Sequence, residues 1–185
     1  MQIYVARHGQ TEWNVLCKVC GRTDIPLTDI GLEQAAQLAE ETAKYDIDLI
    51  IASPMLRAQQ TAGAIAQRCG LEILTDDRLI EQDYGACEGL DRFDPMFLNC
   101  KRNFPTRYPG GESMLDLACR VYGFLDELPM RCPGKNILLV CHGGVMRAIR
   151  TYFEDMTNEA YFNYSADNAK LEVYQYGLGR SVSWI

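Results

Sequence analysis

Histidine is scarce in this chain, because its 185 residues include only two, His8 and His142. Long apolar runs are missing as well, since no stretch approaches the roughly 20 residues that span a bilayer. A signal peptide consists of a basic region, an apolar segment and a cleavage site, and the N-terminal stretch does not show this pattern. We therefore expect a cytoplasmic protein with no membrane partner.

Positive charge is also in deficit. The net charge is −7 and the isoelectric point is about 4.9. Such a balance disfavours nucleic acid as the main partner. An anionic small molecule would need arginines gathered locally against the overall field.

The eight cysteines are numerous, but with no export signal we expect them to remain thiols. Cys17 and Cys20 form one isolated Cys-x-x-Cys pair. It has no second pair and no histidine at ligand spacing, so we expect neither a metal site nor a cofactor. The 48% hydrophobic and 23% charged fractions are typical of a globular protein, and we expect one domain over residues 1–185.

Apolar runs and helical periodicities alternate along the chain. Strands are expected at 2–6, 48–52, 72–75 (an edge strand) and 136–141, helices at 30–44, 54–69, 114–128 and 144–154, and a hairpin at 169–176 and 180–185. This alternation predicts an α/β fold with a mostly parallel sheet covered on both faces. Residues 76–112 read as an irregular excursion, which we interpret as a lid or pocket wall.

Both histidines stand directly after a buried strand, in Arg7-His8-Gly9 and in Cys141-His142-Gly143-Gly144. Ligands of parallel sheets bind beyond the carboxyl ends of the strands. If the two strands are neighbours, the two imidazoles face one crevice. A neutral imidazole is a nucleophile toward phosphorus, and guanidinium forks match phosphoryl oxygens. Arg7 and Arg57, which follow the first and second strands, can supply those forks.

A leaving oxygen needs a proton, and our candidate donor is Glu81, which enters the irregular excursion. Asp83 and Glu88 are rivals for this role. A carboxyl group does this near neutral pH only when desolvation or negative neighbours raise its pKa. The backbone N–H groups of Gly143 and Gly144, which open a helix, would add an anion site.

An ordered set of motifs resembles the histidine phosphatase superfamily, the phosphoglycerate-mutase-like group. The set is Arg7-His8-Gly9, Asn14, Ser53-Pro54-x-x-Arg57, Glu81 and Cys141-His142-Gly143. The segment Pro109-Gly110-Gly111-Glu112-Ser113 is similar to one common in the phosphatase branch. The resemblance covers nearly the whole chain. It implies a three-layer α/β/α sandwich with a mostly parallel central sheet.

The resemblance also implies roles for single residues. His8 would be phosphorylated, and Glu81 would protonate the leaving group and then activate water. The phosphoryl oxygens would be held by the Gly143 N–H and by the side chains of Arg7, Asn14, Arg57 and His142. Contacts to the substrate are further implied at Gly9, Cys20, Gly21, Tyr84 and Gly144, although Cys20 and Tyr84 have packing roles as open alternatives.

The function predicted in this way is metal-independent hydrolysis of a small phosphorylated metabolite through a phosphohistidine. Three alternatives stay open. The first is a phosphoglycerate-type mutase, although the mutases that the chain resembles are longer, with extra segments after the Glu81 position. The second is a cysteine phosphatase, since Cys141 and Arg147 form Cys-x5-Arg at a strand–loop–helix junction. The third is a non-catalytic phosphate-binding module.

The substrate and the oligomeric state stay open at this level. Lys101, Arg102 and Arg107 lie in the excursion. They either recognise a second phosphate or a carboxylate or are solvated surface charges.

Overall fold

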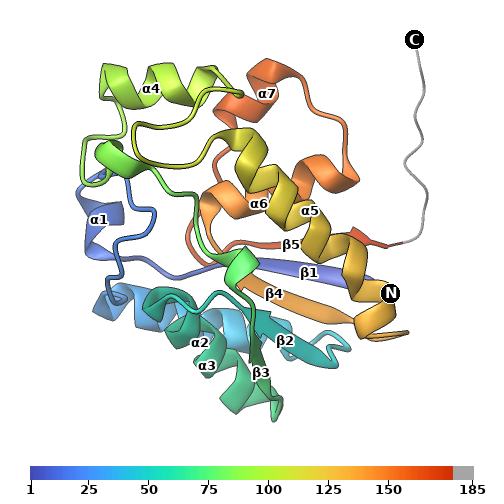
Figure 1. The fold of residues 1–185 in the computed structure, drawn as a ribbon. Helices are drawn as coiled ribbons and strands as arrows, with labels where there is room; N and C mark the ends of the chain where they lie inside the picture. Colours follow the sequence, from blue (N-terminus) through green and yellow to red (C-terminus); the bar gives the residue numbers. More distant parts are fainter. Residues whose placement is uncertain (177–185) are drawn as a thin grey trace.

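The central sheet of the computed structural model, which describes residues 1–176, is mostly parallel. Within this range its strands are β1 (Gln2–Arg7), β2 (Leu49–Ala52), β3 (Ile73–Thr75), β4 (Ile137–Cys141) and β5 (Leu171–Gln175). They lie in the order β3-β2-β4-β1-β5, and only β5 runs antiparallel to its neighbour (Figure 1). The predicted sheet is confirmed, with β3 at an edge.

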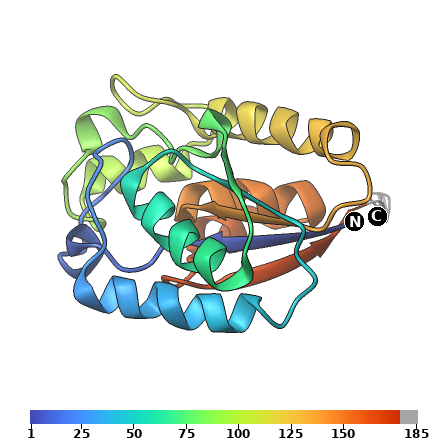
Figure 2. The ribbon, with the colours of Figure 1, turned by 90° about the horizontal axis from the view of Figure 1, so that it is seen from below.

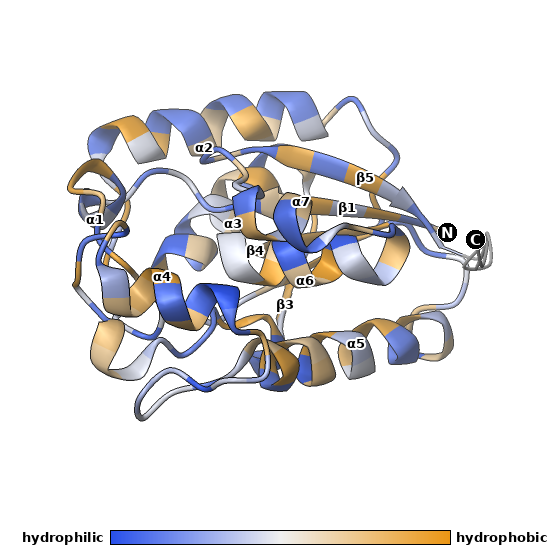
Figure 3. Ribbon diagram, turned by 90° about the horizontal axis from the view of Figure 1, so that it is seen from above, coloured by the Kyte–Doolittle hydropathy of each residue, from blue (hydrophilic) through white to orange (hydrophobic). Residues whose placement is uncertain are grey.

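Helices cover both faces of the sheet. One face carries α2 (Asp29–Thr42) and α3 (Leu56–Cys69), and the other carries α5 (Met114–Arg131) and α6 (Gly143–Phe153) (Figures 1 and 2). Side chains along β4 alternate between the two layers, as the pleat of a strand requires. Figure 3 shows polar and apolar bands alternating along α2 and α5, as amphipathic helices produce. The predicted three-layer α/β/α sandwich is confirmed.

Local signals set the ends of these helices. Thr28 and Ser113 cap α2 and α5 through their hydroxyl oxygens, and Gly70 ends α3 in the left-handed conformation. Our expectation that Pro54 lies in the first turn of α3 is wrong. That helix begins at Leu56, after a bend at 54–55, so Arg57 is its second residue.

The excursion at 76–112 is less irregular than expected. It contains two short 3₁₀ turns, Asp77–Leu79 and Gly85–Cys87, and the helix α4 (Pro95–Arg102). The Asp94 side chain caps α4 and Pro95 opens it, a helix start that our interpretation of 76–112 as irregular did not include. Two more short helices that the sequence did not predict are α1 (Glu12–Val15) and α7 (Asn158–Asn163).

A small apolar cluster fastens the excursion to the rest of the chain. Its buried members are Val19, Tyr84, Cys87, Phe97, Cys100 and Tyr108. Tyr84 meets Phe97 and Tyr108 edge to face, with ring centroids 5.5 and 5.1 Å apart. This segment is therefore a packed wall with α4 on it.

Three further expectations concern the chain as a whole. β5 confirms the first half of the predicted hairpin, and its second half at 180–185 lies outside the described residues. The eight cysteines, all within residues 1–176, are free thiols. No helix in the same range has the length and apolar character to cross a membrane.

Candidate active site

The two histidines meet because their strands are neighbours. β1 pairs with β4 in parallel, with Arg7 opposite Cys141, so His8 and His142 follow adjacent strand ends. Their ring centroids lie 5.1 Å apart with an angle of 59° between the planes. The expected meeting of the two rings at the carboxyl edge of the sheet is therefore confirmed.

His8 is held in one tautomer. Its Nδ1 lies 2.7 Å from the carbonyl oxygen of Gly9, which can only accept a hydrogen bond, so Nδ1 carries the proton. Nε2 keeps its lone pair. Burial, together with the nearby Arg7 and Arg57, lowers the pKa of His8 well below its usual range. The buried surroundings of the ring therefore favour its neutral form.

Residues distant in sequence fix the backbone around His8. The Asn168 amide donates to the carbonyl oxygens of His8 and Gly9 and to Oδ1 of Asn14, at 3.2, 3.2 and 3.0 Å. The Gly9 N–H donates to Oγ1 of Thr61 at 3.0 Å. Asn168 was missed in the sequence because nothing near it in the chain links it to His8.

His142 is held by groups of the protein itself. The Arg57 Nε donates to His142 Nδ1 at 3.2 Å, so the proton is on Nε2, which donates to Ser53 Oγ at 2.8 Å. The other guanidinium nitrogens of Arg57 donate to the carbonyl oxygens of Gly21 and Thr23 at 2.8 and 3.0 Å. His142 and Arg57 are fully buried. Burial, with Arg57 and His8, also lowers the pKa of His142.

These two neutral rings predict an acid sensitivity. An unfolded histidine binds its proton near pH 6.5, whereas both native rings resist protonation, so the unfolded state binds more protons below that pH. The contribution of the two neutral rings to the free energy of unfolding is complete above about pH 6.5. It is lost as the pH falls toward the pKa values of the rings in the native state. Each ring contributes a slope of up to about 1.4 kcal/mol per pH unit.

Urea unfolding between pH 5 and 8 measures this slope for wild type and for His8→Asn. The slope of the variant should be smaller than that of wild type by the contribution of one ring, up to about 1.4 kcal/mol per pH unit. Equal slopes for the two proteins would contradict the buried neutral state of His8.

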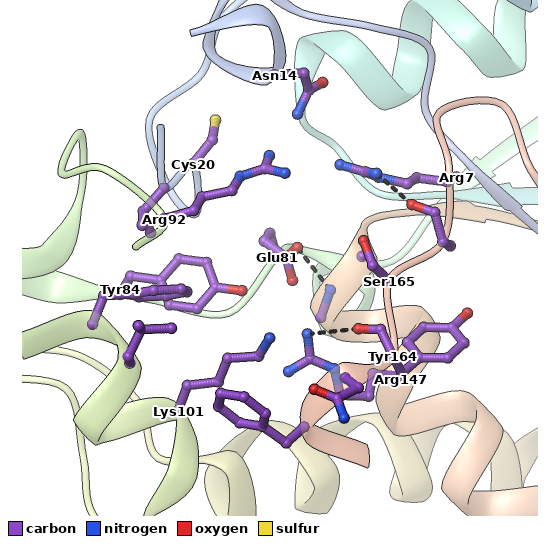
Figure 4. Close-up of a pocket in the computed structure, with 18 of the residues that line it drawn as sticks. Arg7, Asn14, Cys20, Glu81, Tyr84, Arg92, Lys101, Arg147, Tyr164 and Ser165 are labelled. Atoms are coloured by element: carbon purple, nitrogen blue, oxygen red, sulfur yellow. Dashed lines mark hydrogen bonds between the residues drawn. The ribbon is translucent and has the colours of Figure 1, made fainter. Parts of the chain in front are cut away.

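A pocket of about 530 Å³ opens at the strand ends (Figure 4). The expected site residues that border it are Arg7, His8, Asn14, Cys20, Glu81, Tyr84, Gly143 and Gly144. Four others, Gly9, Gly21, Arg57 and His142, lie behind this surface, where they hold one another or His8. Arg57 and His142 thus support the pocket without bordering it.

Arg7 presents an open donor to the pocket. Its Nη1 donates to the carbonyl oxygen of Ala166 at 2.5 Å, whereas its buried Nε has no acceptor. A Cβ on Gly143 would lie 3.7 Å from this Nε, at an ordinary van der Waals distance. Burial and the nearby Arg92 lower the pKa of Arg7 to about 10, which leaves it charged at neutral pH.

Glu81 lies deep in the pocket, only 5% exposed. Its two carboxylate oxygens accept the N–H groups of Gly144 at 2.9 Å and Gln82 at 2.8 Å. A Cβ on Gly144 would lie 2.5 Å from Oε1, so this close approach requires glycine. The expected anion site at both N–H groups of the α6 terminus is therefore wrong for Gly144, whose donor already serves Glu81.

The two rival carboxylates do not border the pocket. Asp83 accepts the N–H of Gly85. Glu88 accepts the N–H groups of Gly21 and Arg22, at 3.1 and 2.8 Å, and the hydroxyl of Thr23 at 2.9 Å. Glu88 thus orders the loop whose carbonyl oxygens receive Arg57. Glu88 therefore positions this loop, a role that the sequence did not indicate when it offered Glu88 as a rival proton donor.

Cys141 faces away from the pocket. It lies in the core cluster beneath α5 and α6, beside residues such as Leu139 and Val145, and it is fully buried. Burial, with Glu81 nearby, raises the pKa of its thiol, which opposes thiolate formation. Arg147, the other half of the Cys-x5-Arg pattern, does border the pocket.

Further cations surround the pocket. Arg92, Lys101, Arg102 and Arg147 border it, whereas Arg107 does not. Arg107 is exposed and pairs with Asp116 through two hydrogen bonds of 2.9 and 3.1 Å. The sequence did not single out Arg92, and it drew attention to Arg147 only through its spacing from Cys141. Among residues 1–176 no cluster of three or more His, Cys, Asp or Glu side chains could hold a metal ion.

Comparison with known proteins agrees with this geometry. The family model of the histidine phosphatase superfamily (branch 1) matches residues 3–183. A Bacillus subtilis protein named "Uncharacterized phosphatase PhoE" is 36% identical over 149 residues, 80% of this chain and 75% of its own. A Yersinia pestis protein named "Probable phosphoglycerate mutase GpmB" is 38% identical over 150 residues, 77% of this chain and 70% of its own.

Solved structures with this fold carry related names. Mycobacterial glucosyl-3-phosphoglycerate phosphatase has a TM-score of 0.83 and 28% identity, over 93% of this chain and 88% of its own. A phosphoserine phosphatase variant from Entamoeba histolytica, in complex with phosphoserine, has a TM-score of 0.85 and 26% identity, over 96% and 92%. Because the family model spans nearly the whole sequence, the chain belongs to the histidine phosphatase superfamily, branch 1, and is an enzyme of that type.

Proposed function

We propose that this enzyme hydrolyses phosphomonoesters without a metal ion, through a phosphohistidine at His8. The observation that carries the proposal is the state of His8 itself. Its Nδ1–H is committed to the Gly9 carbonyl oxygen, and its neutral ring borders the pocket beside the unpartnered Nε of Arg7. The relatives named as phosphatases support the same reaction class.

In the first step, His8 Nε2 attacks phosphorus, the P–N bond forms and the P–O bond to the leaving group breaks. The charge on the phosphoryl oxygens would be met by Arg7 Nε, the Gly143 N–H and the Asn14 amide. Oδ1 of Asn14 already accepts from Thr11 and Asn168, so its NH₂ group is the part that donates to a ligand. A protonated Glu81 gives its proton to the leaving oxygen.

In the second step, the Glu81 carboxylate takes a proton from water and the water oxygen attacks phosphorus. The P–N bond breaks, and its electron pair returns to His8 Nε2. Inorganic phosphate leaves, and Glu81 is protonated for the next cycle. One carboxyl group therefore serves as acid and then as base.

We further propose that His142 and Arg57 reach the phosphoryl oxygens when substrate is bound. In the present conformation His142 Nε2–H donates to Ser53, and a phosphoryl oxygen between the two rings would replace that acceptor. Arg57 keeps His142 neutral and oriented through its bond to Nδ1.

Hydrolysis of p-nitrophenyl phosphate in EDTA tests the proposal, with Cys141→Ala as the companion variant. Wild type should turn over the ester, and Cys141→Ala should retain its rate within about threefold. The reason is that Cys141 faces the core and only a small cavity is left. Loss of turnover in a folded Cys141→Ala protein would support a cysteine nucleophile. An inert wild type would support a narrow-substrate mutase or a binding module.

A mutase is the second candidate, because several relatives from Yersinia are named as probable phosphoglycerate mutases. A mutase returns the phosphoryl group to the bound glycerate, whereas a phosphatase gives it to water. Incubation with 3-phosphoglycerate separates the two. We expect inorganic phosphate as the product, and accumulation of 2-phosphoglycerate at a faster rate would favour the mutase.

A further inference from the structure

The pocket carries more positive charge than one phosphoryl group needs. The described residues that border it include one acid, Glu81, and five bases, Arg7, Arg92, Lys101, Arg102 and Arg147. This surplus occurs in a chain whose net charge is −7. Gathering like charges in a partly buried cavity costs free energy unless an anion is bound there.

These bases are divided between two ends of the pocket. In Figure 4, Arg7 and Asn14 lie on one side of Glu81, and Lys101 and Arg147 lie on the other. Under the proposed mechanism the phosphoryl group lies at the Arg7 end, and the leaving oxygen lies at Glu81. The body of the leaving group then extends toward Lys101 and Arg147.

Arg147 has unused hydrogen-bonding capacity at this far end. Its Nε is buried and has no acceptor, and its Nη2 donates a long hydrogen bond of 3.4 Å to the carbonyl oxygen of Tyr164. The guanidinium stacks 5.2 Å from the ring centre of Tyr161, which fixes its orientation. Within the described residues it forms no ion pair. Its charge is thus held in place but not neutralised.

Lys101 is in the same situation. Its Nζ lies 4.7 Å from the ring centre of Phe162, on α7, and no carboxylate pairs with it among residues 1–176. Burial, with Arg147 and Arg92 nearby, lowers the pKa of Lys101 to about 8. Arg107, by contrast, is exposed and has Asp116 as its partner. Lys101 and Arg147 therefore both border the pocket without a carboxylate partner among the described residues.

We propose that the physiological substrate carries a second anionic group, a carboxylate or a second phosphate, on its leaving group, and that Arg147 and Lys101 bind it. The inference rests on the proposed phosphatase function and adds the substrate class. A monoester with a neutral leaving group would leave both side chains uncompensated. A doubly anionic ester would bring a counter-charge to both side chains, which border the pocket.

Three substrates of similar size test this inference by release of inorganic phosphate. Glycerol 3-phosphate has no second anion. In 3-phosphoglycerate a carboxylate replaces the CH₂OH group of glycerol 3-phosphate, and propane-1,3-diol bisphosphate carries a second phosphate. For wild type, kcat/KM of at least one doubly anionic ester should exceed that of glycerol 3-phosphate about 10-fold or more. Charge-assisted hydrogen bonds to the second anion account for a difference of this size. Which of the two is preferred identifies the anion.

The variants Arg147→Gln and Lys101→Gln should bring the preference ratio toward 1, mainly through KM for the doubly anionic ester. Two independent variants guard against misfolding of either one. Arg107→Gln removes the same charge from the same segment, away from the pocket, and should keep the wild-type ratio.

Equal kcat/KM for all three esters in wild type would overturn the inference, as would an unchanged ratio in both pocket variants. If wild type hydrolyses p-nitrophenyl phosphate but has equal kcat/KM for the three esters, the inference of a second anion is overturned and the proposed phosphatase function stands. No turnover of any ester would overturn the proposed function with it.

Discussion

His8→Asn should lower kcat/KM for p-nitrophenyl phosphate by about 10³-fold or more, because the variant has no nucleophile to form the phosphoenzyme. Asparagine is the substitution of choice here. Its amide NH₂ can donate to the Gly9 carbonyl oxygen in place of Nδ1–H, so the backbone around position 8 is preserved. The loss then reports on Nε2 and not on the fold.

Trapping of the phosphoenzyme gives the direct measurement. Wild type quenched during turnover of labelled substrate should carry a phosphoryl group that is labile in acid and stable in alkali, as a phosphorus–nitrogen bond is. His8→Asn should carry none and should keep its circular dichroism spectrum. A folded His8→Asn protein with near wild-type activity would exclude the phosphohistidine route.

Glu81→Gln should lower steady-state turnover by about 10²- to 10⁴-fold, the contribution of a general acid–base group. The two steps should respond differently. p-Nitrophenolate leaves without a proton, so the first step should survive and give a burst of one equivalent of product. Attack of water on the phosphohistidine should then be slow, because no base activates it, and the phosphoenzyme should accumulate.

Stopped-flow absorbance measures this burst, and Asp83→Asn is the matched control. Asp83 is an acid in the same segment, it does not border the pocket, and an asparagine oxygen can still accept the Gly85 N–H. The control should retain the wild-type rate within about threefold. If Glu81→Gln slows burst and steady state equally, the effect comes from the lost contact with Gly144 or Gln82 and not from proton transfer.

Much of the fold could be predicted because its signals are local. The buried strands, the caps at Thr28 and Ser113 and the C-terminal Gly70 each depend on a few consecutive residues. The buried face of α5 repeats at helical spacing. The helices α1, α4 and α7 were not predicted because they are short, and a short helix has too few residues to show an apolar periodicity.

The sequence predicted which residues belong to the candidate site better than it predicted how they are arranged. Arg7, His8, Asn14 and Glu81 border the pocket as expected, because strand ends and motif order are written in the sequence. Arg92 and Asn168 were missed. Each reaches the site from a separate loop, and no spacing along the chain relates it to His8.

That two strands end in histidine can be read from the sequence alone, which also predicted an enzyme of the histidine phosphatase type with a mostly parallel α/β sheet. The protonation and hydrogen bonding of these histidines could be read only from the folded chain. The adjacency of β1 and β4 brings the rings to 5.1 Å, and long-range partners such as Arg57 and Ser53 select the His142 tautomer. Folding also buried Cys141 and left Nε of Arg147 without an acceptor. The reason is physical: protonation and pairing depend on distances between groups far apart in the chain, and folding alone sets those distances.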